Sequence, residues 1–146
     1  MGLHYVNWNA TSSGLEDKQI FLDAFSWLVG NPGIPKSEKT TSYFGGSIHL
    51  ITASITSKSQ ATKSLQKLGK SNLEQIQAEL EHRLDEKNCI HLRLDLDALL
   101  AGEISLVIRS HGRTVKGTLK LEVYPGNDPY DVAVSTIENA IKESNP

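Results

Sequence analysis

The segment from Cys89 to Leu96 constrains the fold more than any other part of this 146-residue chain. Its residues alternate strictly between apolar and polar, with Ile90, Leu92, Leu94 and Leu96 against Cys89, His91, Arg93 and Asp95. Successive side chains of a β-strand point to opposite faces of a sheet, so this alternation predicts a strand with one buried face and one polar face. The chain is therefore expected to contain a sheet with unlike faces.

Strands are also predicted at residues 3–10, with His4, Val6 and Trp8 on one face, and at residues 47–56, 104–109 and 114–123. The last two are expected to form a hairpin around residues 110–113. Helices are expected after Ser13, Ser57, Ser71 and Asp128, because each precedes apolar residues at helical spacing and can cap a helix. Residues 31–44 are predicted to form a polar loop. The resulting order, β-α-β-α-α-β-β-β-α, predicts an α+β fold: a largely antiparallel sheet with helices on one face.

The totals restrict the class of protein. A chain of this length is typical of one domain, so residues 1–146 are expected to form a single domain. The single cysteine, Cys89, excludes an intrachain disulfide and is consistent with the cytoplasm. There is no apolar run of roughly 18 residues, so no membrane partner is expected. A net charge of −2 does not favour a nucleic-acid partner for the chain as a whole.

Two basic segments nevertheless lack any acidic residue. Residues 57–71 carry Lys63, Lys67 and Lys70, which fall on one face of a helix at about 100° per residue. Residues 104–121 carry Arg109, Arg113, Lys116 and Lys120, of which Lys116 and Lys120 share one face of a strand. Such cations can neutralise phosphates. The alternatives are a solvated helix face and an edge strand that uses lysine against aggregation.

Exposed aromatic side chains could stack on unpaired bases, and Tyr43 and Phe44 are the best candidates for this role. The alternative is that these two residues fill the edge of the core. Trp8, Phe21, Phe25 and Trp27 are expected in the core or in helix–sheet packing instead. No catalytic residue, metal site or cofactor is predicted. An enzyme would require His4, His49 or His91 to converge with Asp95 or Asp97 in a cleft.

Several short motifs resemble, in order, an archaeal family of small proteins described as RNA-binding or as predicted exosome subunits. They are His4-Tyr-Val, Ala10-Thr11 with Glu16-Asp17, Gly45-Gly46, Leu92-Arg-Leu-Asp95, and Ala98-Leu-Leu-Ala-Gly102-Glu103. The resemblance covers about residues 3–123. It implies a fold like that of the large-subunit ribosomal protein that binds the small ribosomal RNA. It also implies RNA as a partner.

Two functions are therefore weighed. The first is a non-catalytic RNA-binding domain, accessory to RNA processing or the exosome, that contacts phosphates through the basic helix and the basic hairpin. The second is a protein–protein interaction module that kept the fold and lost RNA binding. It would act as a monomer or a homodimer through an exposed strand edge or the acidic helix 72–86.

Overall fold

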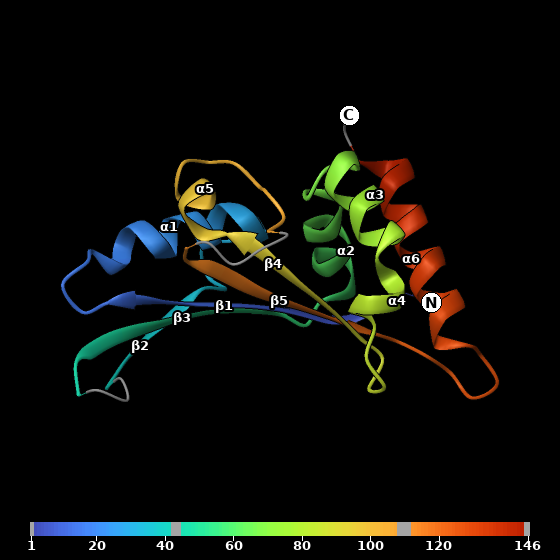
Figure 1. Ribbon diagram of the computed structural model, residues 1–146, viewed down its shortest axis with the longest axis horizontal. Coiled ribbons are helices and arrows are strands. Elements are labelled where there is room, and N and C mark those ends of the chain that lie inside the picture. Colours follow the sequence, from blue (N-terminus) through green and yellow to red (C-terminus); the bar gives the residue numbers. More distant parts are fainter. Residues whose placement is uncertain (1, 42–44, 108–111, 145–146) are drawn as a thin grey trace.

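The computed structural model describes residues 2–41, 45–107 and 112–144. Its sheet consists of five antiparallel strands in the order β2-β3-β1-β5-β4 (Figure 1). The strands are β1 (Leu3–Ser13), β2 (Lys36–Thr41), β3 (Ser47–Ile55), β4 (Cys89–Asp95) and β5 (Thr114–Leu121). The central strand β1 therefore pairs with β3 on one side and β5 on the other.

The described helices lie on one face of this sheet, and none of them covers the other face (Figure 1). They are α1 (Lys18–Val29), α2 (Lys58–Gln66), α3 (Lys70–Ala78), α4 (Leu80–Arg83), α5 (Leu96–Leu100) and α6 (Pro129–Glu143). One group, α2, α3, α4 and α6, stands beside a smaller group of α1 and α5. The predicted α+β class, with an antiparallel sheet covered by helices on one side, is confirmed.

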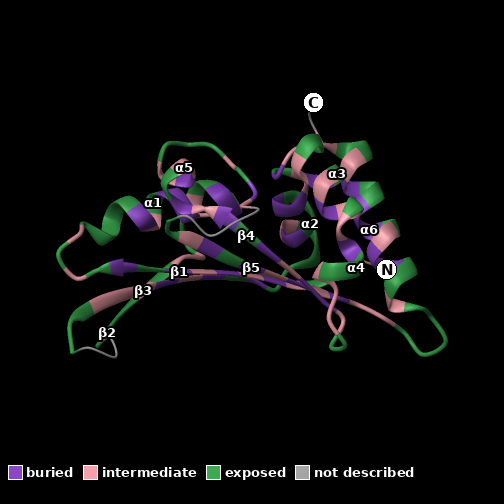
Figure 2. Ribbon diagram, viewed as in Figure 1, coloured by how far each residue is buried: buried purple, intermediate pink, exposed green. Residues whose placement is uncertain are grey.

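The core fills the space between the sheet and the helices (Figure 2). Trp8 at the centre of β1 is 1% exposed, and its ring lies over Gly117 of the paired strand β5. A methyl group on Gly117 would lie 2.8 Å from the ring carbon Cε3 of Trp8 and still nearer to Cζ3. The glycine thus makes room for the largest side chain of the core.

A register shift between Leu3 and Tyr5 changes the predicted faces at the start of β1. Leu3 is buried on the same side as Val6 and Trp8, whereas His4 is exposed. The prediction that His4 shares the face of Val6 and Trp8 is therefore wrong, because a bulge adds one residue to the alternation.

Strand β2 replaces part of the loop predicted at residues 31–44. Lys36–Thr41 pairs antiparallel with the outer side of β3, from Lys36 opposite Thr52 to Thr41 opposite Ser47. The segment is polar at every position, so it carries no alternation that would predict a strand. It is ordered by pairing with the backbone groups of β3, the next strand along the chain.

The predicted hairpin of residues 104–109 and 114–123 is wrong, since both sides of β5 are taken by β1 and β4. Residues 104–107 run along the outer side of β4 instead. There the amide of Val107 donates to the carbonyl of Arg93 at 3.0 Å, and the amide of Asp95 donates to the carbonyl of Ser105 at 2.9 Å. Residues 108–111, which include Arg109 and the first two residues of the predicted turn, lie outside the described residues.

The helix starts predicted after Ser57 and Asp128 are confirmed, since these residues are the N-caps of α2 and α6, whereas α1 and α3 begin elsewhere. Ser13 and Glu16 do make the expected hydrogen bond, from the Ser13 amide to Glu16 Oε1 at 3.0 Å, but α1 begins later, with Asp17 as its N-cap. The Ser57 side chain makes no capping bond to α2, and α3 begins at Lys70, before Ser71.

Candidate nucleic-acid interface

The bare side of the sheet, called the open face below, is formed by every second residue of each strand. Residues paired across antiparallel strands point to the same side, so the register fixes the members of this face. The central row crosses all five strands: Arg93, Lys116, Asn9, Thr52 and Lys36. The adjacent rows contain His91, Thr118, Asn7 and Ser54 on one side of it, and beyond them Lys120 and Tyr5.

Arg93 and Lys116 form a like-charge pair at the β4–β5 end of this row. The Arg93 guanidinium donates to the hydroxyl of Thr114 at 3.1 Å. Among the described residues neither cation has an ion-pair partner. Like charges directly opposite each other on two strands are destabilising. An anion between them would remove this repulsion, so the pair is suited to a phosphate.

The neighbouring side chains extend this chemistry across the face. The Lys120 amine donates to the carbonyl of Lys87, so its charge stays at the rim of the sheet. Tyr5 is half-buried beside Lys120, and its ring lies 5.4 Å from the ring of His4. Lys36 is exposed at the opposite edge of the sheet. The open face therefore combines cations, amides and one aromatic ring.

Carboxylates on this face are few and peripheral. Asp95 at the end of β4 accepts the backbone amide of Asp97 at 3.0 Å and so caps helix α5. Glu38 lies on β2, paired with Leu50. The half-buried Leu50 and Ile48 make this corner more apolar than the β4–β5 end. Positive charge without a carboxylate partner is thus concentrated toward β4 and β5.

Arg113, one of the predicted phosphate contacts, is held by two carboxylates. Its Nη1 atom lies 2.8 Å from Glu16 Oε2, and its Nη2 atom lies 2.8 Å from Asp97 Oδ1. These hydrogen bonds, the one to Glu16 first, raise the pKa of the Arg113 guanidinium. The guanidinium also lies 5.7 Å from the centre of the Phe21 ring. Its contacts join β5 to α1 and α5 rather than leaving a free cation.

The predicted lysines of the basic helix lie on the other side of the sheet from Lys116 and Lys120. Lys63 belongs to α2 and Lys70 begins α3, and α2 packs on the covered face against β1 and β3. The two basic segments of the sequence therefore do not meet on one surface.

Lys67 is engaged with Trp27 of α1. Its amine donates to the Trp27 carbonyl and lies 4.3 Å from the centre of the indole ring. Burial lowers the pKa of Lys67. Trp27 is 41% exposed, so its predicted place in the core is wrong: it lies where α1 meets the end of α2. Tyr43, Phe44 and Arg109 lie outside the described residues.

Several open-face residues were not among the predicted contacts: Tyr5, Asn7, Asn9, Lys36, His91 and Arg93. The alternation of residues 89–96 already assigned His91 and Arg93 to a polar face. What the sequence lacks is the register that sets Arg93 beside Lys116, since the two are brought together by pairing of distant segments. Lys36 was missed because its strand was missed.

The three histidines considered for an enzyme lie on three different strands of the sheet: His4 on β1, His49 on β3 and His91 on β4. His4 lies near the start of β1, whereas His49 pairs with Ser12 near its end, so about 25 Å of strand separates them at ~3.3 Å per residue. His91 Nε2 lies 2.6 Å from Asp85 Oδ2. Within the described residues, no three His, Cys, Asp or Glu side chains gather in a way that could hold a metal ion.

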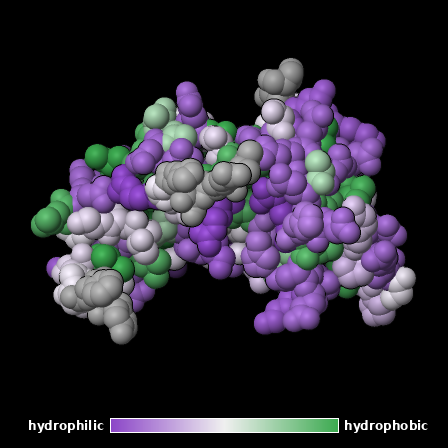
Figure 3. Space-filling view, in the orientation of Figure 1, coloured by the Kyte–Doolittle hydropathy of each residue, from purple (hydrophilic) through white to green (hydrophobic). Residues whose placement is uncertain are grey.

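Figure 3 shows two kinds of region on the surface. Hydrophilic side chains dominate over α3, α4 and α6, while exposed hydrophobic residues such as Leu15 and Ile20 belong to the region of α1. None of the helices in the described part of the chain is both long and apolar enough to span a membrane.

Solved structures share this fold over nearly the whole chain. A DUF54 protein from Methanothermobacter thermautotrophicus has a TM-score of 0.75 and 26% sequence identity, covering 95% of this chain and 98% of that chain. A DUF54 protein from Archaeoglobus fulgidus has a TM-score of 0.69 and 26% identity, covering 96% and 98%. A UPF0201 protein from Methanococcus jannaschii, at 17% identity and a TM-score of 0.60, covers 94% and 98% and shows the fold alone.

Sequence comparison gives the family. No curated protein sequence matches the chain significantly. A family model described as RNA binding matches residues 5–121, which include β1 from its third residue on and all of the other four strands of the sheet. The predicted resemblance is therefore confirmed, and the chain belongs to this RNA-binding family.

Proposed function

We propose that this chain binds RNA across the open face of its sheet, with Arg93 and Lys116 as the central phosphate contacts. The observation that carries the proposal is their like-charge pairing, without a carboxylate partner among the described residues, on a polar sheet face that no described helix covers. A folded protein gains no stability from such a pair. A phosphate would turn the repulsion into two favourable contacts.

The remaining cations extend this contact along and across the sheet. Lys120 lies four residues along β5 from Lys116, which corresponds to about 13 Å of strand. Lys36 lies at the far edge, four strands from Arg93, or about 19 Å at the usual spacing of ~4.8 Å. Phosphates of one RNA segment could therefore reach several of these cations at once.

Base recognition would come from the residues between the cations. Asn7 and Asn9 are half-buried on the central strand, and each carries donors and an acceptor that can pair with a base edge. Tyr5 offers an aromatic ring on which a base could stack. In this proposal the cations supply affinity, while the residues of β1 supply contacts to bases.

The proposal is tested by titrating a fluorescent RNA of mixed sequence with the protein at salt concentrations of about 50 to 200 mM. The test variant is Arg93→Ala/Lys116→Ala, and the matched control is Lys63→Ala/Lys70→Ala, which removes the same charge from the opposite side of the sheet. The test variant is expected to reduce the slope of log affinity against log salt by about 1.4, for two lost phosphate contacts on a single strand.

The control variant distinguishes RNA binding by the open face from RNA binding by the basic helix. Little change in the control, with a strong loss in the test variant, supports the open face. A loss confined to Lys63→Ala/Lys70→Ala would instead favour the helix lysines, with Lys67, as the phosphate contacts and refute the open-face proposal. Absence of RNA binding by the folded wild-type chain at low salt would refute both.

A place in RNA processing or in the exosome, and a likeness to the ribosomal protein named above, rest on the sequence resemblance alone. We propose the processing role as the cellular setting of the RNA contact. Copurification of the tagged chain with RNA-processing subunits that survives ribonuclease treatment would support it. Recovery of bulk RNA without such subunits would count against it.

The protein-interaction alternative is supported by β2, which is an edge strand of the sheet. Its outer backbone groups are available for pairing with a strand of another chain. Its exposed charged side chains, Lys36, Glu38 and Lys39, are of the kind that discourages such pairing. Self-association in sedimentation experiments that is abolished by Thr40→Pro would favour this alternative.

A further inference from the structure

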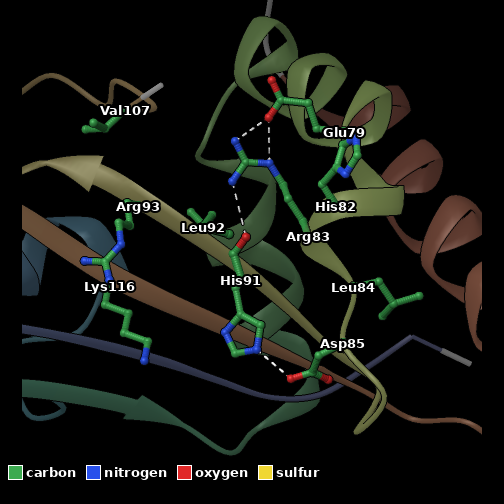
Figure 4. Close-up of a pocket in the computed structure, with 10 residues that line it drawn as sticks. All are labelled: Glu79, His82, Arg83, Leu84, Asp85, His91, Leu92, Arg93, Val107 and Lys116. Atoms are coloured by element: carbon green, nitrogen blue, oxygen red, sulfur yellow. Dashed lines mark hydrogen bonds and ion pairs between the residues drawn. The ribbon is translucent and has the colours of Figure 1, made fainter. Parts of the chain in front are cut away.

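A groove lies along the outer side of β4, next to the open face. Its volume is about 680 Å³, within the range of about 300 to 1,000 Å³ typical of small-molecule sites. Its floor is formed by His91, Leu92 and Arg93, and residues from 79 to 85 line it on one side (Figure 4). Val107 lines it on the other side.

The groove exists because the outer side of β4 is covered only at its two ends by the described chain. At one end the amide of Asp85 donates to the carbonyl of Cys89 at 2.9 Å. At the other end residues 105–107 pair with Arg93 and Asp95. Between them the carbonyl of His91 accepts a hydrogen bond from the Arg83 guanidinium at 3.2 Å, so a side chain takes the place of a neighbouring strand.

The two carboxylates that line the groove are both engaged. Glu79 accepts Nε of Arg83 at 2.9 Å, and Asp85 accepts His91 as well as two backbone amides (Figure 4). Arg93 and Lys116, by contrast, carry no ion pair among the described residues, and both line the groove as well as the open face. The groove and the open face therefore share their unpaired positive charge.

The walls of the groove combine this charge with apolar surface. Leu92 is buried at the floor, and Leu84 and Val107 are half-buried at the sides. His82 is exposed on α4 at the rim. Apolar side chains on both sides of a cation match a nucleotide, whose base has apolar faces and whose phosphate is anionic.

We infer that this groove receives one unpaired nucleotide of an RNA strand whose backbone is held by Arg93 and Lys116, so that the protein selects single-stranded over double-stranded RNA. This inference rests on the proposed function. Bases of a duplex are stacked and paired, and they cannot enter a groove beyond the sheet edge without leaving the helix. The phosphates of a duplex could still reach the open face, so duplex would bind more weakly rather than not at all.

The test compares one fluorescent RNA of about 12 nucleotides as a single strand and as a duplex, at one salt concentration. The wild-type chain is expected to bind the single strand about tenfold more tightly than the duplex. Val107→Trp fills the groove without changing charge and is expected to remove most of this preference. The matched control is Leu15→Trp, a residue that is 99% exposed and far along the chain from the groove.

A second groove variant keeps the test valid if Val107→Trp misfolds. Thermal unfolding of Val107→Trp would reveal such misfolding. His82→Glu places a negative charge at the rim and is expected to weaken single-strand binding in the same direction. Equal affinity of the wild-type chain for both RNAs, or single-strand affinity unchanged in both groove variants, would overturn the inference while leaving RNA binding on the open face intact. Absence of any RNA binding by the wild-type chain would overturn the proposed function and the inference together.

Discussion

Replacing Gly117 by alanine tests the contact between this residue and Trp8 at the centre of the core. In an ordinary strand a change from glycine to alanine stabilises by about 0.5 to 1 kcal/mol, because the unfolded chain loses freedom. Here the new methyl group would lie 2.8 Å from Trp8 Cε3, in a strand paired on both sides. Overpacking of this kind costs about 1 to 3 kcal/mol.

The free-energy cost of overpacking is expected near the upper end of this range, because Trp8 is 1% exposed and its ring cannot move outward into solvent. The net effect is a destabilisation of about 2 kcal/mol. With a denaturant slope of about 2 kcal/mol per M, the urea midpoint of Gly117→Ala should fall by about 1 M. Unfolding can be followed by tryptophan fluorescence together with circular dichroism.

Gly2→Ala is the matched control, since a methyl group there has no neighbouring atom within 4 Å. Its unfolding free energy should stay within about 0.5 kcal/mol of the wild-type value. The double variant Trp8→Phe/Gly117→Ala should recover part of the loss relative to the sum of the single changes, because the smaller ring relieves the clash. A Gly117→Ala protein as stable as the wild type would refute the packing argument.

Three further predictions concern side chains with assigned contacts. Arg113→Ala should leave RNA affinity unchanged and lower the melting temperature slightly, because its guanidinium is already held by two carboxylates. A large loss of RNA affinity would contradict this. Lys67→Met should change the fluorescence of Trp27 and destabilise by about 0.5 to 1 kcal/mol, since the cation over the indole is lost; an unchanged spectrum would speak against that contact. The hydrogen bond from His91 lowers the pKa of Asp85, so its stabilisation is present above the ordinary carboxyl value of 3.8 and is lost as the pH falls below it. Asp85→Asn should therefore flatten the acid side of the unfolding free energy against pH, and identical acid limbs in the two proteins would disprove the assignment.

The parts of the fold that follow from local pattern could be predicted from the sequence. Alternation identified β4 and assigned Arg93 to a polar face, and helical spacing identified the apolar side of α6. Strand β2 could not be predicted, because a strand exposed on both faces has no alternation of hydrophobicity. The sheet faces at the start of β1 were predicted wrongly, because a bulge adds one residue and so shifts the alternation of buried and exposed side chains.

The candidate site was predicted less well than the fold, for a different physical reason. Each cation can be seen in the sequence, and the shared strand face of Lys116 and Lys120 was predicted correctly. Which cations lie together depends on sheet register, and which are free depends on their partners. Arg113 looked equivalent to Lys116 in sequence, but its two carboxylate partners come from α1's entry turn and from α5. Only the tertiary structure distinguishes the two.

The placement of all described helices on one side of the sheet has a consequence for how this protein can change over time. Residues at alternate positions of each strand meet different selective demands: one set must fill the core, while the other touches no packed layer. Substitutions in the second set can alter what the protein recognises with little effect on whether it folds. Recognition and stability can therefore evolve, or be engineered, almost independently, with a period of two residues separating the positions that control each.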